Sequence, residues 1–310
     1  MLKNLIRRFP LTSFFALAFG VSWMFWMPYV LGDHGTNVEP DIHIPEIGGS
    51  GQLVGLLPGA YLGPLTAAFI VTMVAEGRAG LRHWKGRLFR WRVGWGWFLG
   101  VLFGVPAAIL LSTAALPAAW EEVRAPSVLI AVAFIPMVIV QFITTATAEE
   151  PGWRDFALPR LQRRFGPVVG TCVLGFLWGC WHLPLFLTEW GGYPDVDWIQ
   201  PVEFVASCIP LSLVMTWVFN RSGQSLPLVM LLHALINSTY SLVWPEVFPK
   251  LDHAKDTLHG LIIVTTIGAI ILIIATRGRL GLDTAEAASD ADAAPRPTPA
   301  SAPAGPAPLA

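Results

Sequence analysis

Charged residues are scarce in this 310-residue chain. Only 13% of the residues are charged and 54% are hydrophobic, and the mean hydropathy is +0.57. Soluble domains carry about 25% charged residues, so the composition excludes an ordinary soluble protein. The formal net charge of −1 also argues against a nucleic-acid-binding protein, and we expect no nucleic-acid partner.

Cysteine is scarce too, and several familiar motifs are missing. The three cysteines, Cys172, Cys180 and Cys208, fall in apolar runs and form no CxxC pair. A disulfide framework is therefore not expected, and we predict that they are small buried side chains. The chain has neither the HExxH motif of zinc proteases nor a glycine-rich phosphate-binding loop.

Long apolar runs are what the chain has in abundance. A helix needs roughly 18 or more apolar residues to cross a bilayer. Eight runs reach that length, near residues 10–31, 52–75, 95–118, 127–149, 168–188, 201–219, 226–245 and 258–276. We therefore expect an all-α polytopic membrane protein with about eight transmembrane helices. The first run lacks a small-residue cleavage site, so we interpret it as a retained anchor rather than a signal peptide.

The basic residues predict the orientation in the membrane. If the N-terminus is cytoplasmic, 17 of the 20 Lys and Arg residues fall in cytoplasmic segments, and only Arg124, Lys250 and Lys255 lie outside. Because Lys and Arg accumulate on the cytoplasmic side, we expect both termini there, in a multi-pass protein of the cell membrane. Residues 281–310 are rich in Ala and Pro, which predicts a disordered cytoplasmic tail after a membrane domain of residues 1–280.

Three apolar runs contain polar residues at positions where they are costly. An ionisable side chain near the bilayer centre costs about 2.5–3.5 kcal/mol. The three places are Glu149 to Arg154, His182, and the pair His233 and Asn237, which lie one helical turn apart. Each alone has a structural explanation: an ion pair at a helix end, a hydrogen-bonded core histidine, or hydrogen bonds between helices. Three such places on separate helices favour one shared polar site.

A carboxylate, two imidazoles and an amide in a dry cavity suit the hydrolysis of an amide bond. A glutamate can accept a proton from water, and imidazole and amide donors can stabilise an oxyanion. Glu149, His182 and His233 are also candidate ligands for a zinc ion that holds the water. Both schemes use the same side chains, so the sequence leaves open whether the cofactor is Zn²⁺ or none.

The order of these motifs resembles that of a known family. EExxxR at Glu149–Arg154, an aromatic-xxx-His-x-Pro element at Trp178–Pro184 and HxxxN at His233–Asn237 look like the motifs of the CPBP intramembrane proteases. That family comprises the type II CAAX prenyl endopeptidases and the bacterial Abi or bacteriocin-processing proteins. The second motif commonly begins with Phe, and here Trp178 takes that position.

The resemblance implies an intramembrane endopeptidase, dependent on either a metal or a glutamate. Its substrate would be a membrane-associated, in some cases C-terminally lipidated, protein or peptide. Carried over by position, Glu149 is the catalytic carboxylate, His182 positions and activates water, and His233 and Asn237 line the oxyanion site. Glu150 and Arg154 then support this geometry.

One alternative from another functional class stays open. A non-proteolytic membrane protein, such as an immunity factor, a scaffold or a small transporter, could share this architecture. For a transporter we would expect further charged or broken helices in matched halves of the chain, and the sequence shows none.

The predicted spans leave a difference in depth between the site residues. Glu149 falls at the cytoplasmic end of its run, whereas His182 lies roughly 20 Å into the next one. Either the fourth helix extends further than the run at 127–149, or the fifth starts nearer Thr171. On these bounds we expect a cavity that opens to the cytoplasm.

Overall fold

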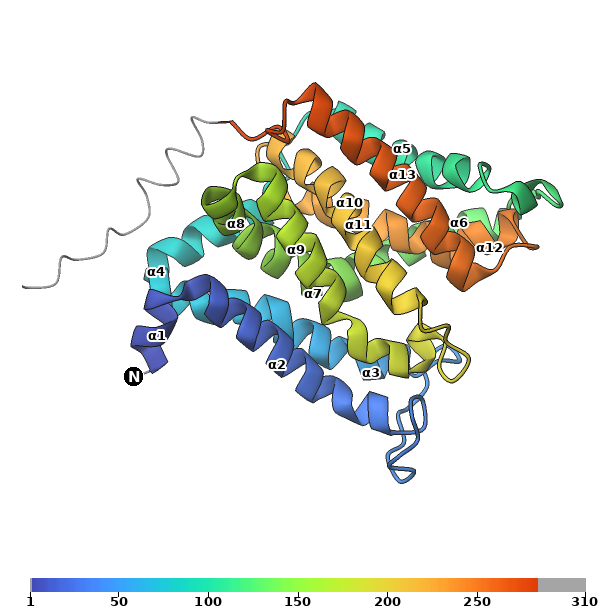
Figure 1. Ribbon diagram of the computed structural model, residues 1–310, viewed down its shortest axis with the longest axis horizontal. Helices are drawn as coiled ribbons and strands as arrows, with labels where there is room; N and C mark the ends of the chain where they lie inside the picture. The colour runs from blue at the N-terminus through green and yellow to red at the C-terminus, as the bar shows by residue number, and fades with distance from the viewer. Residues whose placement is uncertain (1, 284–310) are drawn as a thin grey trace, which may run out of the picture.

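The structure is a computed structural model that describes residues 2–283, and these form helices and connecting segments without a β-strand (Figure 1). Eight helical stretches are long and apolar enough to cross a membrane, namely Pro10–Leu31, Gln52–Leu88, Trp95–Thr113, Val128–Phe165, Pro167–Leu187, Gln200–Arg221, Leu226–Val247 and His253–Ala275. The prediction of an all-α, multi-pass membrane protein is confirmed. The predicted tail at 281–310 lies, beyond residue 283, outside the described residues.

The α-helices surround a buried central helix. They are α1 Leu2–Arg8, α2 Pro10–Leu31, α3 Gln52–Ala60, α4 Thr66–Leu88, α5 Trp95–Thr113, α6 Val128–Gln141, α7 Thr147–Glu150, α8 Leu158–Phe165, α9 Pro167–Trp181, α10 Gln200–Arg221, α11 Leu226–Ser238, α12 Trp244–Val247 and α13 His253–Ala275. Helix α11 packs against α5, α6, α7 and α10, and α10 in turn packs against α9 and α13. The core therefore forms around α11, which carries one of the three polar motifs.

Wider π-helical turns interrupt three of the spans. They are η1 Tyr61–Leu65, η3 Phe142–Ala146, η4 Pro151–Ala157 and η7 Thr239–Val243. Proline has no backbone N–H to continue an α-helix, and Pro64 and Pro151 each lie in one of these segments. Such turns are frequent at functional sites, and here η3 and η4 flank the residues Glu149 and Glu150.

The fourth span is longer than the sequence predicts. It runs from Val128 to Phe165 instead of ending near residue 149. All residues of η4 are buried, and Arg154, which we expected in a cytoplasmic segment, is 0% exposed. Glu149 therefore lies within its span, and the first of the two explanations for the depth difference is the correct one.

The second span continues as a helix to Leu88, but it is broken close to its predicted end. Gly77 has a positive φ of 68°, which glycine adopts readily and which interrupts α4 two residues after the predicted end at 75. Beyond this break, Arg87 is buried against Asp155 rather than exposed with its basic neighbours.

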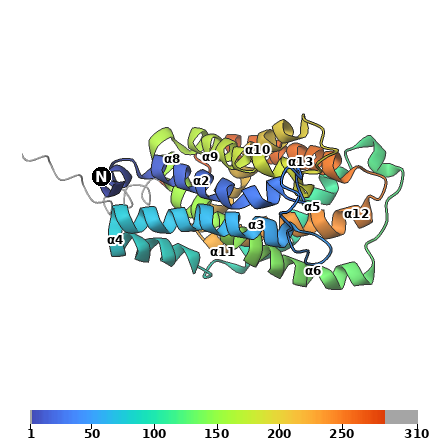
Figure 2. The same ribbon diagram turned by 90° about the horizontal axis from the view of Figure 1, so that it is seen from below.

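Exposed charge divides between the two ends of the bundle. The basic end carries Lys3, Arg7, Arg8, Arg78, Arg82, Lys85, Arg90, Arg92, Arg163, Arg164, Arg221, Arg277 and Arg279. The acidic end is formed by the segments 32–51, 114–127, 188–199 and 248–252, with the exposed acids Asp33, Glu39, Asp41, Glu46, Glu121, Asp195, Asp197 and Asp252. In Figure 2 the N-terminus and α8 lie toward one end of the molecule and α12 toward the other.

Candidate active site

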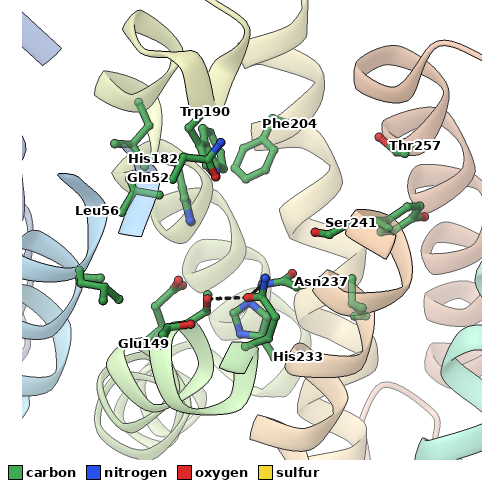
Figure 3. A pocket seen from close by; sticks show the side chains of 18 of the residues that line it. Gln52, Leu56, Glu149, His182, Trp190, Phe204, His233, Asn237, Ser241 and Thr257 are labelled. Carbon is green, nitrogen blue, oxygen red and sulfur yellow. Dashed lines mark hydrogen bonds between the residues drawn. The ribbon is translucent and has the colours of Figure 1, made fainter. Parts of the chain in front are cut away.

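The predicted catalytic residues line one cavity. Its volume is about 580 Å³, and Glu149, His182, His233 and Asn237 all lie on its wall. Figure 3 shows Glu149, His233 and Asn237 at one level and His182 with Trp190 and Phe204 at another. Glu150 and Arg154 are not part of the lining. The three motifs thus converge, but only part of the first one faces the cavity.

Glu149 is held by a tryptophan from the second motif. The indole Nε1 of Trp178 donates a hydrogen bond of 2.7 Å to Oε2 of Glu149. Glu149 lies in α7 and is 4% exposed. Successive residues of a helix point about 100° apart, which turns Glu149 to the cavity and Glu150 away from it.

Glu150 joins two of the other motif residues behind the cavity wall. Its Oε1 lies 2.7 Å from Nδ1 of His233, and its Oε2 lies 3.3 Å from Nε of Arg154. The side chains of Glu150 and Arg154 are both 0% exposed. When the carboxylate accepts from His233, Nδ1 carries the proton and Nε2 is the ring nitrogen left for the cavity. Glu150 thus fixes the orientation of His233.

Arg154 connects Glu150 to Trp178. Its guanidinium carbon lies 4.2 Å from the centre of the Trp178 ring, a cation–π contact. Nη2 approaches Ser212 Oγ at 3.4 Å and Met215 Sδ at 3.1 Å. Within residues 2–283, Nε and Nη1 have no hydrogen-bond partner of good geometry, so the ion pair with Glu150 is the main compensation for burying this charge.

His182 ends α9 and lies among aromatic rings. Its Nδ1 is 2.9 Å from the carbonyl oxygen of Trp178, and because a carbonyl only accepts, Nδ1 carries the proton. The ring centroid lies between 4.7 and 5.9 Å from those of four neighbours, Trp178, Trp181, Trp190 and Phe204. No hydrogen bond joins His182 to Glu149 in the described part of the chain. Trp178 contacts both residues and sets their relative position.

Asn237 lies one turn after His233 on α11, as their spacing predicts. Its Nδ2 approaches Oε1 of Gln141, on α6, at 3.5 Å. This weak contact leaves the amide available to a bound molecule. His233 and Asn237 therefore present an imidazole and an amide to the same space opposite Glu149.

The side chains do not form a ready zinc site. Among residues 2–283, no group of three or more His, Cys, Asp and Glu side chains is placed to hold a metal ion. The protein engages Nδ1 of His182 and of His233, which leaves only Nε2 of each ring for the cavity. The ligand set of Glu149, His182 and His233 that the sequence suggests is thus not assembled for a metal, and the chemistry is derived below from these side chains alone.

The cavity opens at the other end of the bundle from the one predicted. Its lining includes Ile47, Ser50, His253 and Thr257, all from the loops and helix starts of the acidic end. Ile47 and His253 are exposed, so the cavity reaches the surface there. The expectation of an opening at the basic end, which the sequence assigns to the cytoplasm, is wrong.

Several lining residues were not identified from the sequence. Gln141 was detectable, because it is a polar residue within the apolar run of α6. The hydrogen bond from Trp178 to Glu149 was not detectable, because the motif specifies an aromatic ring at this position and does not specify a hydrogen-bond donor. Gln52 and Trp190 come from regions without any motif.

Comparison with known proteins gives a match over the site. Residues 131–239 match the family model described as type II CAAX prenyl endopeptidase Rce1-like, a range that contains every predicted site residue. The chain is similar to "CAAX prenyl protease 2" of Methanococcus maripaludis, with 29% identity over 114 residues. That match covers 36% of this chain and 41% of the relative, so the similarity is confined to less than half of either protein.

Proposed function

We propose that the chain is an intramembrane endopeptidase of the Rce1-like type II CAAX prenyl endopeptidase family, because residues 131–239 match the model of that family and 114 residues are similar to a CAAX prenyl protease 2. It hydrolyses a peptide bond in a membrane-associated protein or peptide. The observation that carries this proposal is the convergence of Glu149, His182, His233 and Asn237 on one cavity from three separate spans.

Glu149 is the general base. Its carboxylate takes a proton from a water molecule as the water oxygen bonds to the scissile carbonyl carbon. The indole of Trp178 holds Oε2, which leaves Oε1 free to contact the water. His182, with its proton on Nδ1, presents Nε2 as an acceptor that orients the same water.

His233 and Asn237 stabilise the oxyanion. The carbonyl oxygen gains negative charge in the tetrahedral intermediate, where N–H donors are most effective. Glu150 holds Nδ1–H of His233, and in its imidazolium form the ring also donates through Nε2–H, so this donor is oriented before substrate binds. Collapse of the intermediate breaks the C–N bond, and the proton held by Glu149 passes to the leaving nitrogen.

We also propose the orientation and the domain limits that the sequence predicts. Both termini lie in the cytoplasm because the exposed basic residues gather at the end of the bundle that contains α1. The protease domain comprises residues 1–280, and the remaining residues are not needed for the chemistry.

The test is cleavage by the purified full-length protein in detergent. We expect it to cleave a membrane-anchored peptide, with the rate falling about 100- to 10,000-fold in Glu149→Gln. Glu121→Gln, an exposed residue at the acidic end, is the matched control and should retain full activity. A strong chelator should leave the rate unchanged. Near-full cleavage by Glu149→Gln would overturn the proposal in favour of the non-proteolytic alternative.

A further inference from the structure

The cavity has its mouth at the acidic end of the bundle. Side chains from three separate segments of that end contribute to the lining: Ser50 and Gln52, Trp190, and Thr257. Glu189 connects two of these segments, since it accepts hydrogen bonds from Ser50 at 3.0 Å and from Tyr29 at 3.2 Å. The loops thus form a rim around the cavity without closing it.

On the basic side the cavity is sealed. Glu150, Arg154 and Asp155, which follow Glu149 along the same span, are each 0% exposed. Below them, Arg87 forms an ion pair with Asp155 and donates a hydrogen bond of 3.0 Å to Gln224. A peptide that approached from this side would have to break two buried ion pairs, and removing one partner of such a pair is strongly unfavourable.

The charges at the two ends relate this asymmetry to the membrane. The exposed Lys and Arg residues concentrate at the sealed end, and the exposed acids at the open end. Basic residues accumulate on the cytoplasmic side, so the sealed end faces the cytoplasm and the mouth faces outward.

We propose that the substrate reaches Glu149 from the extracytoplasmic face of the membrane. The substrate class is then the outward-facing juxtamembrane segment of a membrane-anchored protein or peptide, not a lipidated C-terminus on the cytoplasmic side. This inference rests on the proposed function and orientation, and it defines the class of substrate that can reach the active site.

Access can be measured without any substrate. In the full-length chain with Cys172, Cys180 and Cys208 replaced by Ala, one cysteine is introduced at Ser241, which lines the cavity and is exposed to it. A cysteine at Arg164, exposed at the basic end, is the matched control. The probe is a positively charged, membrane-impermeant methanethiosulfonate reagent.

We expect the reagent to modify Ser241→Cys in intact cells and Arg164→Cys only in inverted membrane vesicles. Modification of Ser241→Cys only in inverted vesicles would overturn the inference. Protection of Ser241→Cys from both sides would also overturn it, because the mouth would then be closed.

The second experiment maps new protein N-termini in membranes of cells that make either the wild type or Glu149→Gln. The inference predicts that the Glu149-dependent N-termini lie at the outward boundaries of membrane spans. N-termini at cytoplasmic tails would contradict this inference while supporting the protease function. If no N-terminus depended on Glu149, the proposed function would fail, and the labelling result would still decide the access route.

Discussion

Trp178 donates a hydrogen bond of 2.7 Å through its indole N–H to Oε2 of Glu149. It occupies the position where the resemblance leads one to expect phenylalanine, which has no such donor. In this chain the aromatic residue of the second motif therefore orients the Glu149 carboxylate that faces the cavity, in addition to packing against its neighbours.

Replacing Trp178 with Phe keeps the ring but removes this bond. A hydrogen bond to a charged group contributes about 1.5–3 kcal/mol, so we expect kcat to fall about 10- to 100-fold with little change in KM. Trp153→Phe is the control, because the Trp153 N–H is buried and has no partner in the described part of the chain. Steady-state kinetics of both variants test this, and equal losses would show that volume alone matters.

Glu150 and Arg154 should behave as a coupled pair. Glu150→Gln leaves the buried charge of Arg154 without its partner, and we expect a loss of stability of about 3–5 kcal/mol. The double variant Glu150→Gln/Arg154→Met removes both charges and should be more stable than either single variant. Thermal unfolding in detergent measures this, and simple additivity of the two losses would rule out the coupling.

Asn237→Ala should lower turnover more than substrate binding. An oxyanion donor acts mainly in the transition state, so kcat should fall while KM stays nearly constant. Asn220→Ala is the control: the Nδ2 of Asn220, a buried residue, donates a hydrogen bond to the carbonyl of Leu280 away from the cavity. That variant should lose stability and keep its kcat. A rise in KM alone for Asn237→Ala would assign this residue to substrate binding instead.

Gly152 allows the second and fourth spans to approach each other beside the site. A Cβ at this position would lie 2.7 Å from the carbonyl oxygen of Pro64. We expect Gly152→Ala to lower the free energy of unfolding by about 1–3 kcal/mol through overpacking. It should also reduce activity by displacing Glu149. Gly20→Ala, where no atom lies within 4 Å of the added carbon, should be neutral. The melting temperatures of the two variants test this, and equal values would contradict the prediction.

The rim of the cavity should respond to pH. Burial tends to raise the pKa of Glu189, but hydrogen bonds from His34, Ser50 and Tyr29 outweigh it and lower the pKa from its usual 4.5. Burial tends to lower the pKa of His34, but the hydrogen bond and charge of Glu189 outweigh it, with help from Asp33, and raise the pKa from 6.5.

This pair stabilises the fold most between about pH 4.5 and 6.5. The contribution of Glu189 is lost as the pH falls through its lowered pKa, and that of His34 as the pH rises through its raised pKa. The melting temperature of the wild type minus that of Glu189→Gln should therefore be largest in this window. A difference that does not vary with pH would show that the pair is not charged.

The sequence by itself determined the class of the protein and the chemistry of its motifs. Apolar runs long enough to span a bilayer predict the eight spans, because every backbone polar group in lipid must be satisfied within a helix. The rarity of ionisable residues in these runs singled out Glu149, His182 and His233 for the same physical reason, the cost of burying them.

Only the tertiary structure decided where the fourth helix ends and which way the cavity opens. In the sequence, Arg154 and Asp155 resemble the polar end of a span. In the structure both are buried, because Glu150 compensates the charge of Arg154 and Arg87 that of Asp155. Arg87 is distant in the sequence from the residue it pairs with, and a local pattern cannot reveal such a partner. The cavity is likewise assembled from seven spans and their connecting loops, so its mouth depends on packing rather than on any single motif.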